Sequence, residues 1–356
     1  AEHADHAERQ QPHRHHAAET DAAGQQGRAR IGFGKRGSEV RAHHVGGHGV
    51  GIARFLRLHG EVVDEHAQAV ECALAGRHGR FARQQRGEQS KQPFAPLRRR
   101  YRVKLRIGYQ LDYDFPQPTP VILMLNVHFS RVSDLDEPDH IRIQPSVRVS
   151  AYRDGFGNWC TRLMAPKGLM RITADAIISD SGLPESYDPH AGQVPVERLP
   201  EESLVFLLAS RFCDNDRLLD LAWRLFGHTE PGAPRVQAIC DFVHRRIAFN
   251  YNDASVTRTA SEAYHEGRGV CRDFAHLAIA FCRALNIPAR YCTCYLGDVG
   301  TPPPYPPGDF AASFEAYLEG GWQMFDPRNN VPRIGRVLIA RGRDAADVAI
   351  ATTFGP

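Results

Sequence analysis

Lysine, long apolar runs and paired cysteine motifs are all scarce in this sequence. Only four lysines stand against forty arginines in 356 residues, and the formal net charge is only +3. A charge this small, without arginines interleaved with aromatic residues, argues against a nucleic-acid partner. The longest apolar run, from Val121 to Val127, is far shorter than a membrane span, and no charged-then-apolar signal segment opens the chain. We therefore expect a cytoplasmic protein without a membrane partner.

The eight cysteines lack the spacing of a small disulfide-rich scaffold, so reduced thiols are expected. Cys292 and Cys294 could ligate a metal, but no second pair stands at zinc spacing. On an apolar strand such cysteines are usually packing residues. The sequence thus predicts no metal and no cofactor.

Residues 1–102 differ in composition from the rest of the chain. They hold 11 of the 18 histidines but only 3 of the 24 prolines, and they show little hydrophobic periodicity. Such a stretch buries too little apolar surface to offset its conformational entropy, so disorder is expected. The excess of arginine over lysine is typical of a GC-rich coding sequence, in which an upstream or wrong-frame stretch translates into this kind of mixture. Because a GTG start codon encodes valine internally, we expect the natural protein to begin near Val103 and residues 1–102 to be disordered or non-native.

A β-rich domain is predicted over residues 103–186. Apolar and polar residues alternate from Leu105 to Tyr113, which indicates a half-buried strand. Further strands, separated by Asp, Gly and Pro turns, are expected over residues 121–129, 141–150, 159–165 and 169–178. Short strands at this spacing predict a β-sandwich. Residues 187–203, rich in proline, glycine and acidic residues, are typical of a linker.

Helical periodicity follows in residues 204–330. One helical face is predicted from Val236, Ile239, Cys240, Val243 and Ile247. A second amphipathic helix opens at Cys271 and ends at Asn286. Strands are expected over residues 291–296, 310–318 and 322–326, the last two joined by a turn at 319–321. Helices followed by a sheet predict an α+β fold, and residues 331–356 are expected to form an extension packed on it.

Cys271 is the most informative residue, since a glycine-bearing loop turns into a helix at this position. The N-terminus of a helix carries partial positive charge, and its free N–H groups stabilise a thiolate. A cysteine so placed is predicted to be a nucleophile, as in thiol acyl-transfer enzymes.

Four segments around this cysteine resemble the transglutaminase-like superfamily, which has a papain-like fold. They are Gly267 to Ala275, Leu285 to Tyr291, Phe314 to Leu318 and Gly321 to Pro327. The β-rich domain is similar to the N-terminal domain that accompanies bacterial members. The resemblance implies that Cys271 attacks an amide carbonyl, that the thioester passes to an amine or to water, and that Asp326 orients a histidine.

The histidine of that family opens a strand in a His-Ala-Trp-X-Glu pattern, and here its position is occupied by Ala311. Ser313 stands at the tryptophan position, whereas Glu315 is retained. The usual proton acceptor is therefore missing, and general acid–base transfer is commonly worth ~10²–10⁴ in rate.

None of the other nearby histidines is a convincing substitute. His276 lies about 140° round the helix from Cys271 and is expected to be packed. His265, in the loop that enters the site, is a weaker candidate that could fold over the thiol. His244 is expected to be exposed on the preceding helix.

Structural roles are expected for the remaining polar residues. Asp273 complements the helix dipole from the first turn, and Glu315 is expected to pair with Arg272 or Arg290. Four arginines after the Asn329-Asn330 turn could bind an acidic substrate or a C-terminal carboxylate, but Asp344 and Asp347 nearby favour a solvated, ion-paired face. These arginines are Arg333, Arg336, Arg341 and Arg343.

Two functions follow from the sequence. The first is a cysteine-dependent acyl-transfer or amide-hydrolysing enzyme that acts on protein or peptide substrates, with crosslinking and hydrolysis both open. The second is a catalytically degenerate binding or scaffold module, which the alanine at position 311 favours. No oligomeric state is indicated. Selective alkylation of Cys271 near pH 6, faster than that of Cys160 or Cys282, is expected if its thiol is ionised.

Mass spectrometry of the native protein tests where the natural chain begins. Peptides from residues 1–90 are expected to be absent, and the first peptide is expected to start near Val103. Abundant peptides from residues 1–90 would contradict this start.

Overall fold

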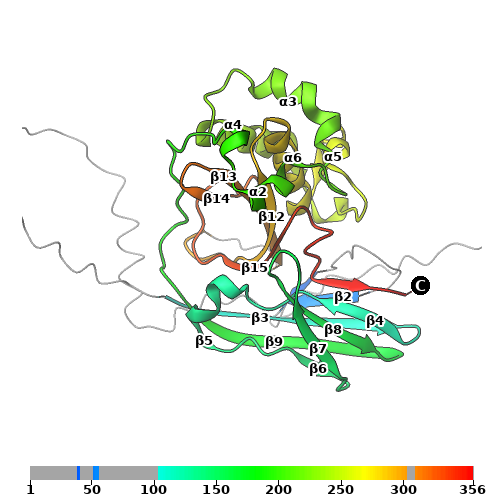
Figure 1. Ribbon diagram of the computed structural model, residues 1–356. Coiled ribbons are helices and arrows are strands. Elements are labelled where there is room, and N and C mark those ends of the chain that lie inside the picture. Colours follow the sequence, from blue (N-terminus) through cyan, green and yellow to red (C-terminus); the bar gives the residue numbers. More distant parts are fainter. Residues whose placement is uncertain (1–37, 41–50, 56–102, 303–308, 356) are drawn as a thin grey trace, which may run out of the picture. The chain divides into compact units, whose positions relative to one another are not determined.

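The computed structural model describes residues 38–40, 51–55, 103–302 and 309–355 (Figure 1). The expectations for residues 1–102 fall outside this part of the chain, apart from two short strands. These are β1 (Ser38–Val40) and β2 (Gly51–Phe55), which pair with each other. β2 also pairs with β3 (Val103–Phe115).

Two antiparallel sheets form the β-rich part, as the alternating pattern predicted. The first has the order β1-β2-β3-β9-β5, with β6 also paired to β9, and the second has the order β16-β4-β8-β7. β3 and β9 (Gly168–Asp180) pair along their whole length, and every second side chain of β3 from Leu105 onward is buried. The other strands of this part are β4 (Thr119–Leu123), β5 (Leu135–Glu137), β6 (Arg142–Gln144), β7 (Val149–Arg153) and β8 (Trp159–Ala165).

The predicted strand over residues 121–129 is shorter in the structure. β4 ends at Leu123, and the chain then turns into the 3-10 helix η1 (Phe129–Asp134). His128 causes this turn, because its ring nitrogen accepts a hydrogen bond from the Ser130 N–H and caps the helix. Leu125 and Val127 are still buried, so the apolar run reflects core packing rather than an extended strand.

The second half of the chain is α+β, as predicted. Its helices in chain order are η2 (Val196–Arg198), α2 (Glu201–Leu204), η3 (Val205–Leu207), η4 (Asn215–Leu218), α3 (Leu219–Phe226), α4 (Ala233–Arg246), η5 (Tyr251–Asp253), α5 (Ala260–Glu266) and α6 (Cys271–Ala284). Its antiparallel sheet has the order β14-β13-β12-β15. These strands are β12 (Ala289–Tyr295), β13 (Phe310–Leu318), β14 (Gly321–Phe325) and β15 (Val337–Gly342).

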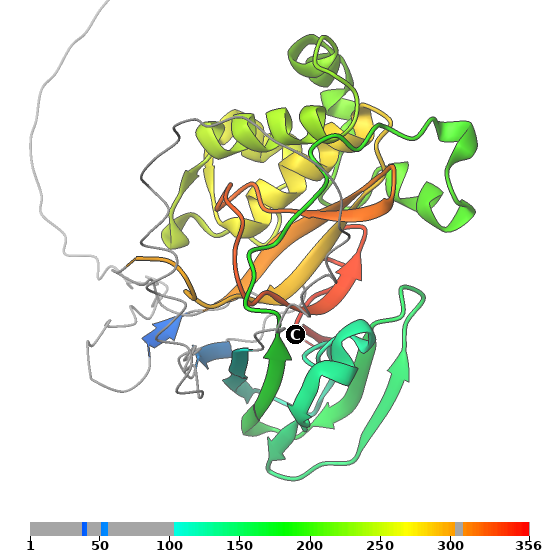
Figure 2. The ribbon, with the colours of Figure 1, turned by 90° about the vertical axis from the view of Figure 1, so that its left-hand side faces the viewer.

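Helix α6 is the central element of this half. It runs beside the sheet, against β12 and β13 (Figure 2), and every residue from Asp273 to Ala284 is buried. The helix ends where predicted, because Asn286 adopts a left-handed conformation (φ 61°) and the Ile287 N–H bonds the Cys282 carbonyl. Only the N-terminal turn of α6, which carries Cys271, reaches the surface of the domain.

The C-terminal segment joins both halves rather than packing on one. β15 pairs with β12 in the second sheet, whereas β16 (Ala351–Thr353) pairs with β4 in the β-rich part. The two sheet systems are therefore tied together by backbone hydrogen bonds at the end of the chain.

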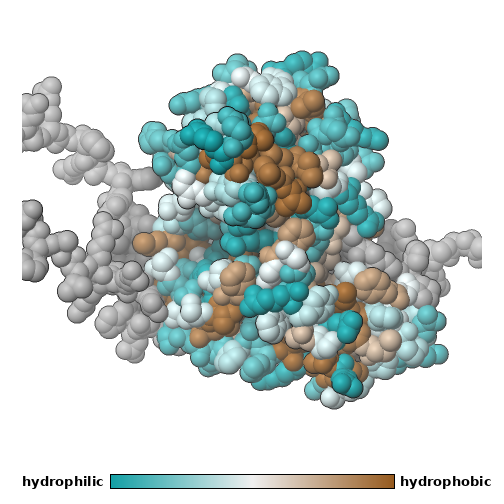
Figure 3. Space-filling model, viewed as in Figure 1, coloured by the Kyte–Doolittle hydropathy of each residue, from teal (hydrophilic) through white to brown (hydrophobic). Residues whose placement is uncertain are grey.

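An apolar patch lies over α2 and η3 on the face seen in Figure 3. Leu204, Val205 and Leu208 are exposed there. None of the described helices is long and apolar enough to cross a membrane.

Arg283 is a buried cation near the end of α6 that serves three backbone carbonyl groups. Its guanidinium donates to the carbonyl of Ala289 at 2.9 Å, to that of Leu208 at 3.0 Å and to that of Arg343. These bonds join α6 to the loops on either side of it.

Replacing this residue, Arg283→Met, is expected to lower the free energy of unfolding by about 3 kcal/mol. The three carbonyl groups lose their donor inside the core, and each costs about 1 kcal/mol or more when left unpaired. Urea denaturation measures the change, with exposed Arg224→Met as the control. A loss no larger than that of the control would contradict a structural role for Arg283.

Candidate functional site

Cys271 is the first residue of α6, and the turn around it is held by a buried acid. The Asp273 carboxylate accepts a hydrogen bond from the Val270 N–H at 2.8 Å, which closes the N-terminus of the helix. Gly269 permits this approach, since a Cβ there would lie 2.8 Å from the Cβ and Cγ of Asp273. Asp273 thus has the structural role expected of a first-turn acid.

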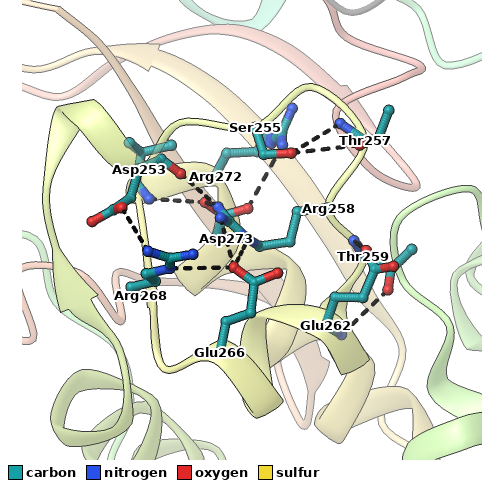
Figure 4. A network of polar contacts seen from close by, with 11 residues as sticks. Asp253, Ser255, Thr257, Arg258, Thr259, Glu262, Glu266, Arg268, Arg272 and Asp273 are labelled. Atoms are coloured by element: carbon teal, nitrogen blue, oxygen red, sulfur yellow. Dashed lines mark hydrogen bonds and ion pairs between the residues drawn. The ribbon is translucent and has the colours of Figure 1, made fainter. Parts of the chain in front are cut away.

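A network of ion pairs surrounds this carboxylate (Figure 4). Arg258, which is only 7% exposed, reaches Asp273 at 3.2 Å and Glu266 at 2.9 Å. Its guanidinium also donates to the Asp253 carbonyl at 2.7 Å. Arg258 therefore fixes the loop between η5 and α5 against the first turn of α6.

The short helix η5, which precedes that loop, carries Tyr251 to the thiol. β10 (Ala248–Phe249) pairs in parallel with β11 (Arg268–Gly269), and the Asn250 N–H donates to the Gly269 carbonyl at 3.0 Å. The register that pairs residue 249 with 269 brings Tyr251 beside Cys271 two residues later. Consistent with this, Cys271 is one of the groups that raise the pKa of Tyr251, after burial and Asp309.

The opposite side of the thiol is formed by the start of β13 and by the segment after β14. The backbone N–H of Ala312 interacts with the Cys271 sulfur, so position 311 is adjacent in β13 to a residue that contacts the thiol. Asp309 stands just before β13 and acts on the same sulfur through its charge. Arg328, whose Cζ lies 4.4 Å from the Phe249 ring centroid, completes the enclosure.

The thiol is protonated at neutral pH, contrary to the expectation from the helix terminus. Burial raises the pKa of Cys271 to about 12, and the charge of Asp309 adds to the rise. The Ala312 N–H and Arg328 oppose this, but their effect is smaller. Desolvation therefore outweighs the helix dipole at this position.

No imidazole among the described residues stands in for the one missing at position 311. His276 is buried, stacks on Phe212 and accepts a hydrogen bond from the Ala345 N–H at 3.1 Å, as expected of a packed residue. His265 lies at the end of α5 with its ring against Tyr264. His244 is exposed on α4, as expected, and its ring contacts the Pro327 carbonyl at 3.2 Å.

Asp326 is bound to an arginine rather than to a histidine. Its carboxylate accepts hydrogen bonds from the Asn329 backbone at 2.9 Å and side chain at 2.7 Å, and pairs with Arg336 at 2.6 Å. Burial alone would raise the pKa of Asp326, but Arg336 and Asn329 hold it below its usual value. The structure therefore places Cys271 and Asp326 in one domain, and within the described residues the partners of the Asp326 carboxylate are Asn329 and Arg336 rather than a histidine.

The other predicted pairs are ionic and structural. Glu315 binds Arg290 at 2.6 Å, as expected, and also Arg341 at 2.9 Å. Arg343 pairs with Asp347 at 2.9 Å.

The four arginines after the Asn329-Asn330 turn were expected to form a solvated, ion-paired face, but two of them are buried. Arg333 and Arg336 are buried, and Arg333 donates to Asn329 at 3.0 Å. Arg336 and Arg341 line a cavity of about 430 Å³. Both guanidinium groups are already ion-paired to acidic side chains in its wall, Glu185 for Arg336 and Glu315 for Arg341.

Three residues of the site escaped sequence reasoning, namely Tyr251, Asp309 and Arg328. Tyr251 could have been found from the short parallel pairing of β10 with β11, but two-residue strands leave no periodicity to read. Asp309 and Arg328 lie within two residues of predicted strand ends, so only the packing of the strands on α6 shows that they face the thiol.

Comparison with known proteins finds a matching family profile and similar sequences. The sequence profile described as the transglutaminase-like superfamily matches residues 220–327. An uncharacterized protein of Mycobacterium leprae is 27% identical over 227 residues, which cover 58% of this chain and 75% of that protein. An uncharacterized protein of Mycobacterium tuberculosis is 29% identical over 223 residues, covering 56% and 69%.

Among solved structures, a "Putative Cysteine Protease" from Cytophaga hutchinsonii matches with a TM-score of 0.62 at 31% identity. The match covers 72% of this chain and 88% of that one.

Alkylation of Cys271 by iodoacetamide is expected to be slow at neutral pH and to rise with pH to above pH 10. At pH 7 the rate is expected to be at least about 10²-fold below that of a free thiol with a pKa near 8.5, because the thiolate is that much rarer. Mass spectrometry of the modified peptide gives the rate, and Cys271→Ala identifies it. An inflection of the alkylation rate below pH 8 would show that the helix N-terminus lowers the pKa of Cys271 by more than burial raises it.

Proposed function

This chain belongs to the transglutaminase-like superfamily, and from that membership we propose that it is a cysteine-dependent acyl-transfer or amide-hydrolysing enzyme. Its substrates are amides of proteins or peptides, and its nucleophile is Cys271. The expected cytoplasmic location belongs to the same proposal.

The observation that carries the proposal is the position of the Cys271 sulfur. It lies at the N-terminus of the central helix, where the fold places the only half-buried cysteine among the seven that are described. Each of the other six is buried, and burial also raises the pKa of Cys213 and Cys282. A substrate carbonyl can therefore reach Cys271 but not the others.

The chemistry follows from the groups around the sulfur. The sulfur attacks the amide carbonyl carbon, the C–N bond breaks, and the amine leaves with the thiol proton. The Ala312 N–H and the Tyr251 hydroxyl are donors at the site, and such donors stabilise the negative charge that develops on the carbonyl oxygen. Tyr251 keeps its proton because burial and Asp309 raise its pKa.

The alternative is a degenerate binding or scaffold module on the same fold. Two observations favour it, namely Ala311 in place of the histidine and the ion pair that occupies Asp326. In this case the surfaces around α6 bind a peptide without breaking an amide bond.

Acylation by p-nitrophenyl acetate distinguishes the two functions. An enzyme is expected to release one equivalent of nitrophenol per chain in a burst and to carry an acetyl group on Cys271. Cys271→Ala is expected to abolish both, because the nucleophile is removed, while Cys160→Ala in the β-rich part is expected to retain them. Stopped-flow absorbance and intact mass are the measurements.

Release of ammonia from a glutamine-containing dipeptide is expected to show the same dependence on Cys271. Absence of both the burst and ammonia release in the unaltered chain would refute the enzyme and leave the binding module.

A further inference from the structure

The groups that enclose the Cys271 thiol come from four separate elements. Tyr251 follows β10, Ala312 lies in β13, and Arg328 follows β14. Asp309 directly precedes β13, which packs against α6, and it lies three residues before Ala312, whose backbone N–H contacts the sulfur. A proton that leaves the sulfur has to be taken by one of these groups or by water.

Asp309 differs from every other acid near the site. Asp273 is held by Arg258, Asp326 by Arg336, and Glu315 by Arg290 and Arg341. Within the described residues, Asp309 has no ion pair, and its carboxylate accepts one hydrogen bond, from the Phe310 N–H at 2.7 Å. One of its two oxygens is therefore available.

The remaining groups cannot accept a proton at neutral pH. Arg328 is a cation, and Tyr251 holds its own proton. Asp298, whose charge also reaches Tyr251, is paired with Arg333 at 3.5 Å and is not among the main influences on the sulfur.

We propose that Asp309 is the proton acceptor for Cys271 and takes the place of the histidine that is absent at position 311. As the sulfur bonds to the carbonyl carbon, the S–H proton passes to the Asp309 carboxylate, directly or through one water. The Asp309 carboxylic acid then returns the proton to the leaving nitrogen as the C–N bond breaks. A thioester and a free amine result, and water or a second amine releases the acyl group.

The acid–base properties of the pair suit this role. Burial raises the pKa of Asp309 to about 7, so both the ionised and the protonated form are accessible near neutral pH and each is available for its step. The Cys271 thiol, with a pKa near 12, is a protonated nucleophile, and the Asp309 carboxylate, with a pKa near 7, is a base beside it. A serine hydroxyl and the imidazole that takes its proton are related in the same way. This inference rests on the proposed function, because it assigns a step of that reaction.

Asp309→Asn tests the role, because it affects two measurements in opposite directions. Removing the negative charge lowers the pKa of the thiol, so alkylation of Cys271 by iodoacetamide at pH 8 is expected to become about twofold faster or more. Removing the base is expected to slow the p-nitrophenyl acetate burst about 10²–10⁴-fold. The rise of the burst rate through pH 7 in the unaltered chain is also expected to disappear.

Asp298→Asn is the matched control, since it removes a neighbouring charge that is already paired with Arg333 and is not among the main influences on the sulfur, and it is expected to leave both rates unchanged. Two results would overturn the inference, namely a burst rate in Asp309→Asn equal to the original, or burst and alkylation rates that fall together. Absence of both the burst and ammonia release in the unaltered chain refutes the proposed function itself, which is a distinct outcome.

Discussion

Asp273 joins three segments that meet at the start of α6. Its buried carboxylate holds the Val270 N–H, and Arg258 and Arg272 lie beside it at 3.2 Å and 3.6 Å. Through Arg258, which donates to the Asp253 carbonyl, it also fixes η5, the short helix that carries Tyr251. A buried acid of this kind is stable only while its partners are in place, and losing one leaves an uncompensated charge. The position of the thiol relative to the groups around it therefore depends on this cluster.

The same dense packing decides the chemical state of the sulfur. A helix terminus attracts negative charge by a fraction of an elementary charge, whereas enclosure by Tyr251, β13 and Arg328 removes the water that would stabilise a thiolate. Asp309 adds a like charge. The outcome is a neutral thiol. Such a thiol attacks a carbonyl carbon only if a nearby group accepts its proton, which is the role that a histidine at position 311 would have had.

Retention of Asp326 is explained by structure rather than by catalysis. Its carboxylate closes the turn to Asn329, and the Asn330 N–H bonds its backbone carbonyl at 2.7 Å. Arg336, which Asp326 binds, also binds Glu185 in the segment that leaves the β-rich part. Asp326 thus connects the end of β14 to the approach of β15 and to the linker. None of these contacts of Asp326 involves a histidine.

The sequence by itself determined the fold and singled out Cys271 as the candidate nucleophile. Alternation in β3, the apolar face of α6 and the motifs around Cys271 are local patterns, and each survives in the structure because one buried face dictates it. The partners of the sulfur were decided only by tertiary structure. Tyr251 and Asp309 lie 20 and 38 positions from Cys271 in the numbering, in segments without regular periodicity, and only the packing of β10 and β13 against α6 brings them together. The pKa of the thiol was likewise set by packing, because desolvation depends on how densely distant segments close over a group and no spacing of residues encodes that.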